Sequence, residues 1–102
     1  MEEYPVLRRP DDPAKLELLM GHRDYYSGIA EANGNAFDSG SLDNSDMEKI
    51  LKPAYVLDLL DEVIEKGEVN TLEFMSALSK RKRGINKCIY DSAVGVARKI
   101  ID

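Results

Sequence analysis

The stretch from Pro53 to Gly67 constrains this chain more than any other part of its sequence. Pro53 favours a break or a kink in a helix, and Gly67 is a typical helix stop. Between them lie six aliphatic residues whose spacing gives a helix a wide apolar face: Val56, Leu57, Leu59, Leu60, Val63 and Ile64. A helix with so wide an apolar face needs partners, so we expect it to be the central helix of the fold.

Three further helices are predicted from helical spacing and from residues that cap helix ends. The first begins at Asp12, which suits the N-cap, and the third and fourth begin after Asn70 and Asn86. A short helix after Ser45 precedes Pro53, so the count is four helices, or five if Pro53 splits the second. No segment alternates with period two, and no strand is expected. The prediction is an all-α, compact single domain over 1–102, a bundle of four to five helices.

Two segments are predicted to lie outside the helices. Residues 1–11 read as an extended N-terminal arm, because Pro5 and Pro10 disfavour helix. Ten of the thirteen residues in 33–45 are Asn, Gly, Ser or Asp, which predicts a long flexible loop. Phe37 and Leu42 are its apolar residues, and they are candidates either to anchor the loop on the body or to contact a partner.

Charge is divided unevenly along the chain. Of 14 basic and 19 acidic residues, residues 1–73 carry 7 basic and 17 acidic groups, a net charge of −10, and residues 74–102 carry 7 and 2, a net charge of +5. Most of the surface should therefore repel nucleic acid, whereas an acidic body with a basic end can steer protein association, including pairing with a second copy of the chain.

Few residues here could support catalysis or hold a metal. The chain has one histidine, His22, and one cysteine, Cys88, so neither a multi-histidine metal cage nor a disulfide framework can form. We expect His22 to be an exposed helix residue and Cys88 to be a small buried hydrophobe. The carboxylates of Asp38, Asp43 and Asp46 lack the EF-hand spacing, because position twelve counted from Asp38 is a lysine. No enzyme activity, cofactor or metal is predicted.

The most distinctive motif is a basic corner formed by Lys80, Arg81, Lys82, Arg83 and Lys87. Cations at a helix C-terminus are favourable, but four in a row exceed what a helix end requires. The basic corner could contact an acidic protein surface or the phosphates of a nucleic acid. Asp91, close behind it in the sequence, opposes the second alternative.

The sequence identifies no known family, so function is predicted by exclusion. We expect a small non-enzymatic regulatory protein that acts by stoichiometric protein–protein binding, such as an inhibitor, an adaptor or an immunity-type protein. The alternative is a nucleic-acid-binding regulator that uses the basic corner from Lys80 to Lys87. No stretch without charge is longer than that from Tyr25 to Ala30, which is far too short to span a membrane, and the acidic start is unlike a signal peptide. We therefore expect no membrane partner and a cytoplasmic location.

Overall fold

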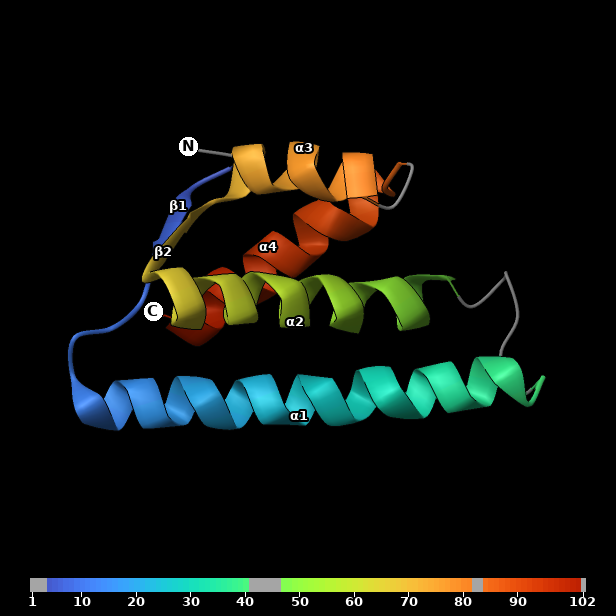
Figure 1. Cartoon of the computed structure of the whole chain (residues 1–102), viewed down its shortest axis with the longest axis horizontal. Helices are drawn as coiled ribbons and strands as arrows, with labels where there is room; N and C mark the ends of the chain where they lie inside the picture. The colour runs from blue at the N-terminus through green and yellow to red at the C-terminus, as the bar shows by residue number, and fades with distance from the viewer. Residues whose placement is uncertain (1–3, 41–46, 82–83, 102) are drawn as a thin grey trace.

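The computed structural model describes residues 4–40, 47–81 and 84–101, and these residues form four helices and two short strands. Their order is β1 (Val6–Arg8), α1 (Pro13–Asp38), α2 (Met47–Lys66), β2 (Glu68–Asn70), α3 (Thr71–Arg81) and α4 (Lys87–Ile101). In Figure 1, α2 lies between α1 and α3, and α4 crosses next to α2. The predicted helical bundle is confirmed at this level, with four helices among the described residues.

The central position of α2 follows from its apolar residues. Its residues Val56, Leu59, Leu60 and Val63 are fully buried, and α2 packs against both α1 and α4. Tyr55 of α2 is buried with them, and the other elements contribute the rest of the buried apolar core: Leu7, Leu19, Val69, Phe74, Leu78, Ile89, Tyr90, Ala93, Val94 and Ala97. Burial of this apolar surface is the main stabilising force in a domain of this size.

The predicted caps lie where the helices begin. The Asp12 carboxylate accepts a hydrogen bond of 2.9 Å from the Ala14 amide, which opens α1. Asn70 accepts from the amides of Leu72 and Glu73, and Asn86 accepts from that of Ile89. Gly67 follows the last residue of α2 with a positive φ of 86°, a conformation that glycine adopts at little cost.

The structure overturns one prediction about the helices and decides between the two alternatives at Pro53, a divided or a continuous second helix. Residues 33–38 belong to α1, so the predicted loop over 33–45 does not begin at residue 33, and its residues 41–46 lie outside the described part of the chain. Pro53 lies inside α2 and does not divide it. The same hydrogen bond bears on both differences: the Asn33 side chain donates to the carbonyl of Lys49 at 2.9 Å, and Lys49 is the residue whose carbonyl Pro53 leaves without its helical donor.

Residues 4–11, the described part of the predicted N-terminal arm, lie before α1 and include a strand, so the prediction that the chain has no strand was wrong. β1 pairs antiparallel with β2, with Leu7 opposite Val69, and both side chains are buried. Each strand has only three residues, too few to show the period-two alternation from which strands are predicted. The pairing fastens the arm next to the C-terminal end of α2, which leaves α1 as the outermost helix on its side of the bundle (Figure 1). None of the helices described is long and apolar enough to cross a membrane.

Candidate binding face on the first helix

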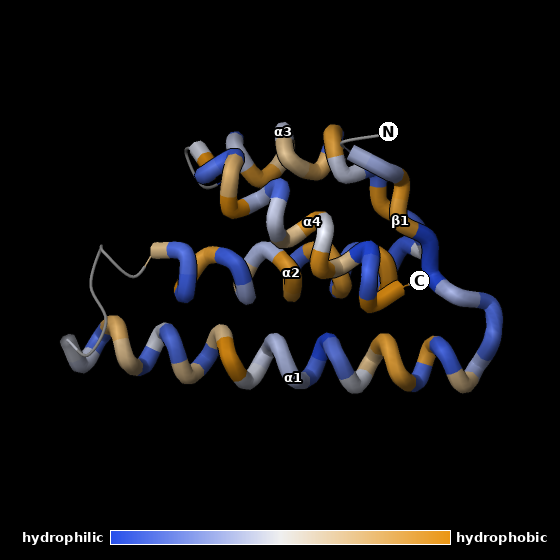
Figure 2. Tube along the Cα trace, turned by 180° about the vertical axis from the view of Figure 1, so that it is seen from behind, coloured by the Kyte–Doolittle hydropathy of each residue, from blue (hydrophilic) through white to orange (hydrophobic). Residues whose placement is uncertain are grey.

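Helix α1 has two apolar faces, and only one of them is buried. Leu19 is buried against the core, with Leu16 and Tyr26 partly buried against it. On the far side, Leu18 and Tyr25 are 67% and 63% exposed, the two most exposed large apolar side chains among the described residues. Figure 2 shows hydrophobic residues recurring along the whole length of α1. Two bulky exposed apolar residues one above the other on a helix are typical of a surface that binds a partner.

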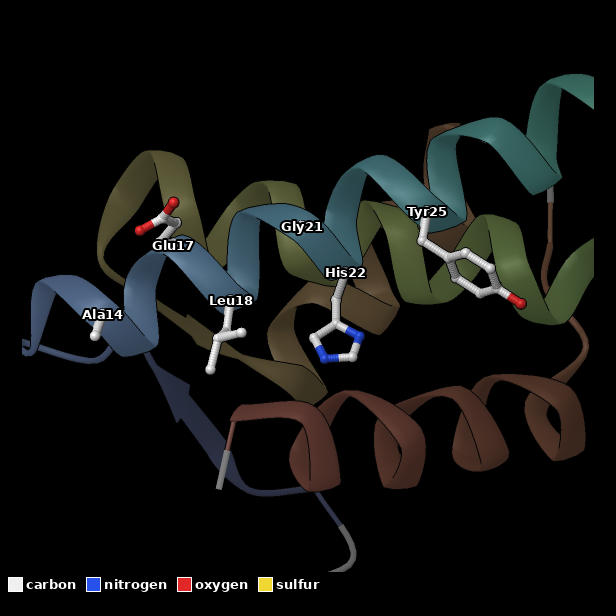
Figure 3. A pocket seen from close by; sticks show the side chains of 6 residues that line it. All are labelled: Ala14, Glu17, Leu18, Gly21, His22 and Tyr25. Carbon is white, nitrogen blue, oxygen red and sulfur yellow. The ribbon is translucent and has the colours of Figure 1, made fainter.

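These exposed residues belong to a regular strip. Leu18 and Tyr25 are seven residues apart along α1. Ala14 and Gly21 are also seven residues apart and lie next to them on the same face of the helix. Together with Glu17 and His22 they line an open hollow of about 860 Å³, and Figure 3 shows the side chains of Leu18, His22 and Tyr25 leaving α1 on one side. We call Ala14, Leu18, Gly21 and Tyr25 the outer strip. A seven-residue repeat of this kind is the spacing that a second helix packs against.

Two of the three glycines of α1, Gly21 and Gly28, are not required by packing inside this chain. Gly21 and Gly28 are both exposed, and a Cβ atom built on either would meet nothing within 4 Å. Each glycine in a helix interior costs about 1 kcal/mol relative to alanine. The fold itself therefore gives no steric reason for glycine at these two positions, whereas close approach of another backbone would.

One edge of the outer strip is acidic. Glu17, Asp24 and Glu31 are exposed and also recur every seven residues, and we call them the acidic row. Of the three, only Asp24 contacts a cation among the described residues, Arg23 at 3.2 Å. The other edge carries Lys15 and His22, so the two edges of the strip differ in charge.

The acidic character continues onto α2. A second hollow of about 430 Å³ lies between the helices and is lined by Met20, Arg23, Asp24, Asp61, Ile64 and Glu65. Arg23 donates from Nε to Asp61 at 2.6 Å, and this bond, with the bond to Asp24, raises the pKa of the guanidinium above its usual value. Arg23 is thus matched by two carboxylates, and the surface around it stays negative.

The basic corner is only partly assembled in the described residues. Lys80 and Lys87 line one hollow of about 430 Å³ between the end of α3 and the start of α4, with Met75, Ser76, Ser79 and Ile85. Arg81 instead lies over the ring of Phe74, 6.0 Å from its centroid. Lys82 and Arg83 lie outside the described residues. Two of the five predicted residues therefore meet in one place.

Lys87 also lies next to the N-terminal arm. Its ammonium lies 3.5 Å from Asp91 and 5.7 Å from the centroid of the Tyr4 ring. The Tyr4 hydroxyl donates to Asp91 at 2.7 Å, and this hydrogen bond to a carboxylate, together with some burial, raises the pKa of Tyr4 above its usual value. One cation of the basic corner is thus already paired with a carboxylate.

The remaining predicted residues have mixed outcomes. Phe37 lies in the last turn of α1, not in a loop, and is 46% exposed, and Leu42 lies outside the described residues. His22 is exposed on a helix, as predicted. Cys88 is exposed, so the prediction that it is buried was wrong. The reason is that α4 turns Ile89, Ala93 and Ala97 toward the core, and Cys88 falls on the other side.

Sequence reasoning missed the outer strip, although a signal was present. The residues of α1 follow two helical repeats, one that faces the core and one that is exposed. The second repeat, in which bulky and small residues alternate every three or four positions, is visible in the sequence from Ala14 to Tyr25.

Within the described residues, no group of three or more histidine, cysteine, aspartate or glutamate side chains is arranged to hold a metal ion. Comparison of the chain with protein-family models, curated proteins and solved structures gave no match in any of the three. Function is therefore inferred from the geometry of this chain alone.

Proposed function

We propose that the protein is a small non-enzymatic regulator that acts by stoichiometric binding to a protein partner, in the manner of an inhibitor or an adaptor. The observation that carries the proposal is the outer strip, in which Leu18 and Tyr25 are largely exposed above a hollow lined by α1. Exposed aromatic and aliphatic residues grouped on one face supply most of the binding energy in protein interfaces. The acidic row beside them would orient the partner and raise the rate of association.

The basic corner supports a second, weaker candidate, a regulator that binds nucleic acid. Lys80 and Lys87 line the same hollow, which is the observation in its favour. Against it stand the hydrogen-bonded carboxylate of Asp91 and the net charge of −5. Protein binding is the better supported function because it accounts for the outer strip, whereas nucleic-acid binding leaves that strip unexplained.

The proposal is tested by photo-crosslinking in cells that express the chain. A benzophenone amino acid replaces Tyr25 on α1 in one variant and Leu72 on α3 in a matched control, since Leu72 is also an exposed apolar residue. We expect an adduct of one defined mass at position 25 and none at position 72. The purified partner should then bind one to one, and Leu18→Asp should weaken binding at least roughly tenfold. Equal crosslinking at both positions, or none at position 25, would contradict the proposed function.

A further inference from the structure

We infer that the outer strip of α1 binds a basic amphipathic helix of the partner, laid along α1 as in a two-stranded coiled coil. This inference rests on the proposed function and names the chemistry of the partner. Three observations lead to it: the seven-residue repeat of the strip, the exposed glycines, and the acidic row along one edge.

The repeat specifies the shape of the partner. Ala14, Gly21 and Gly28 recur every seven residues, and so do Leu18 and Tyr25. In coiled-coil terms these are the two seam positions of one helix, one filled by small residues and the other by bulky ones. A straight seam with holes at Gly21 and Gly28 fits the side chains of a second helix, because knobs on one helix insert into holes on the other.

The glycines support a close approach. Both are exposed, and nothing in the chain lies within 4 Å of where their Cβ atoms would be. Alanine at these two positions would make the helix α1 more stable than glycine does. The glycines along the seam therefore lower the stability of α1 itself. A partner backbone that passes close to α1 needs this space.

The acidic row specifies the charge of the partner. In the same register, Glu17, Asp24 and Glu31 occupy the position that flanks the seam, where charges choose the partner and its orientation. The side-chain carboxylates of Glu17 and Glu31 have no hydrogen-bond or ion-pair partner within the part of the chain that the structure describes. Lysine or arginine at the matching positions of the partner helix would pair with them.

The same row argues against a second copy of this chain as the occupant. If two α1 helices paired antiparallel, acidic row would face acidic row, with Asp24 near its own counterpart. In a parallel pair, Glu17 would meet His22, but Asp24 would meet Ile29, an apolar residue. A basic helix satisfies all three carboxylates, and self-pairing does not.

The test uses two designed peptides of about four heptads, with leucine and alanine at the seam positions. One carries lysine at both flanking positions and the other carries glutamate there, so that like charges prevent either peptide from pairing with itself. A scrambled lysine peptide of the same composition controls for nonspecific attraction to an acidic protein. Binding of labelled peptide to the full chain is measured by fluorescence anisotropy at physiological ionic strength.

We expect the lysine peptide to bind at least roughly tenfold more tightly than the glutamate peptide and than the scrambled peptide. Leu18→Asp should abolish this binding, whereas Leu72→Asp on α3 should leave it unchanged. Glu17→Lys with Glu31→Lys should reverse the order of the two peptides. Gly21→Ala with Gly28→Ala should raise the thermal midpoint of the protein and yet weaken peptide binding. Weaker binding by a more stable protein cannot be explained by unfolding of the variant.

Several outcomes would overturn the inference. They are equal binding of the lysine and scrambled peptides, an unchanged order in the charge-reversed variant, or a dimer of this chain in solution that Leu18→Asp dissociates. None of them would remove the crosslink at position 25. A partner captured there that binds the charge-reversed variant equally well would refute the basic helix while leaving the proposed function intact. Absence of any crosslink would refute the function itself.

Discussion

The side-chain amide of Asn33 donates a hydrogen bond of 2.9 Å to the backbone carbonyl oxygen of Lys49. In an uninterrupted helix, that carbonyl would accept from the amide of the residue four positions later, which here is Pro53 and has no N–H. A residue on α1 thus supplies the donor that α2 lacks. This contact explains how α2 passes through a proline, and it joins the last third of α1 to the first turn of α2.

The first prediction concerns the Asn33 side chain as a replacement for the amide donor that Pro53 lacks. Asn33→Ala should lower the free energy of unfolding by about 1 kcal/mol, the usual net value of one hydrogen bond. In a Pro53→Ala background the same change should cost much less, because the new amide of residue 53 can donate to Lys49. The four proteins form a double-mutant cycle that is measured by urea unfolding. Equal costs of Asn33→Ala in both backgrounds would mean that Asn33 and Pro53 act independently.

A second prediction concerns the N-terminal arm. The buried hydroxyl of Thr71 donates to the carbonyl of Pro5 at 2.7 Å, between residues 66 positions apart. Thr71→Val keeps the shape of the side chain but leaves this acceptor with only the longer bond of 3.4 Å from the Thr71 amide. We expect a loss of about 1–2 kcal/mol of stability.

A readout specific to the arm distinguishes this effect from a general loss of packing. Arg8 is the last residue of β1, so trypsin should cleave the Arg8–Arg9 bond faster once the arm is loosened. Thr71→Ser retains the hydroxyl and should keep cleavage slow despite its smaller side chain. If Thr71→Val is cleaved no faster than the unaltered protein, the Pro5 contact does not hold the arm.

How much of this fold could be predicted depended on the range of the interactions. The caps at Asp12, Asn70 and Asn86 act on amides two or three residues away, and all three were predicted from sequence. The helical state of residues 33–38 and the passage of α2 through Pro53 were not, because the bond from Asn33 joins elements 16 residues apart. Helix propensities describe neighbouring residues only, so they cannot predict that a donor from α1 replaces the amide that Pro53 lacks.

The candidate site divides in the same way. The basic corner was visible as a run of cations, but the sequence could not reveal that Arg81 lies over Phe74 while Lys80 and Lys87 share a hollow. The outer strip was visible only as spacing. Deciding which of the two apolar faces of α1 is buried requires the position of α2, which is a property of the whole fold.

The third prediction concerns stability at high pH. Tyr90 is fully buried and donates from its hydroxyl to the carbonyl of Thr71 at 2.6 Å, and burial raises its pKa well above the usual value of 10.0. Because the folded-state pKa is the higher one, the unfolded chain loses this proton first as the pH rises. The resulting stabilisation is complete below pH about 10 and is lost progressively above it.

Tyr90→Phe tests this sign. The variant should be less stable than the unaltered protein at pH 8, because it lacks the hydrogen bond to Thr71, by about 1 kcal/mol. Its stability should then fall less steeply between about pH 9 and 11, since phenylalanine has no proton to lose. Urea unfolding followed by circular dichroism across this range gives both slopes. Parallel slopes for the two proteins would show that Tyr90 does not govern the alkaline limit.

The last prediction separates the two candidate functions at the basic corner. Duplex DNA held by five cationic contacts would give a log–log slope of binding against salt of roughly −4 to −5. Asp91 lies within 3.5 Å of Lys87, so one of these cations is already paired. We expect no sub-micromolar binding to DNA or single-stranded RNA at moderate salt, and a shallow slope for the weak binding seen at low salt.

Reversal of Lys80 and Arg81 to glutamate should leave the fold intact, because both are exposed on the last turn of α3. If that variant loses a tight, steeply salt-dependent interaction with nucleic acid, the regulator binds nucleic acid through this corner. If it instead weakens only the protein captured at position 25, the basic corner is a second contact for the same partner.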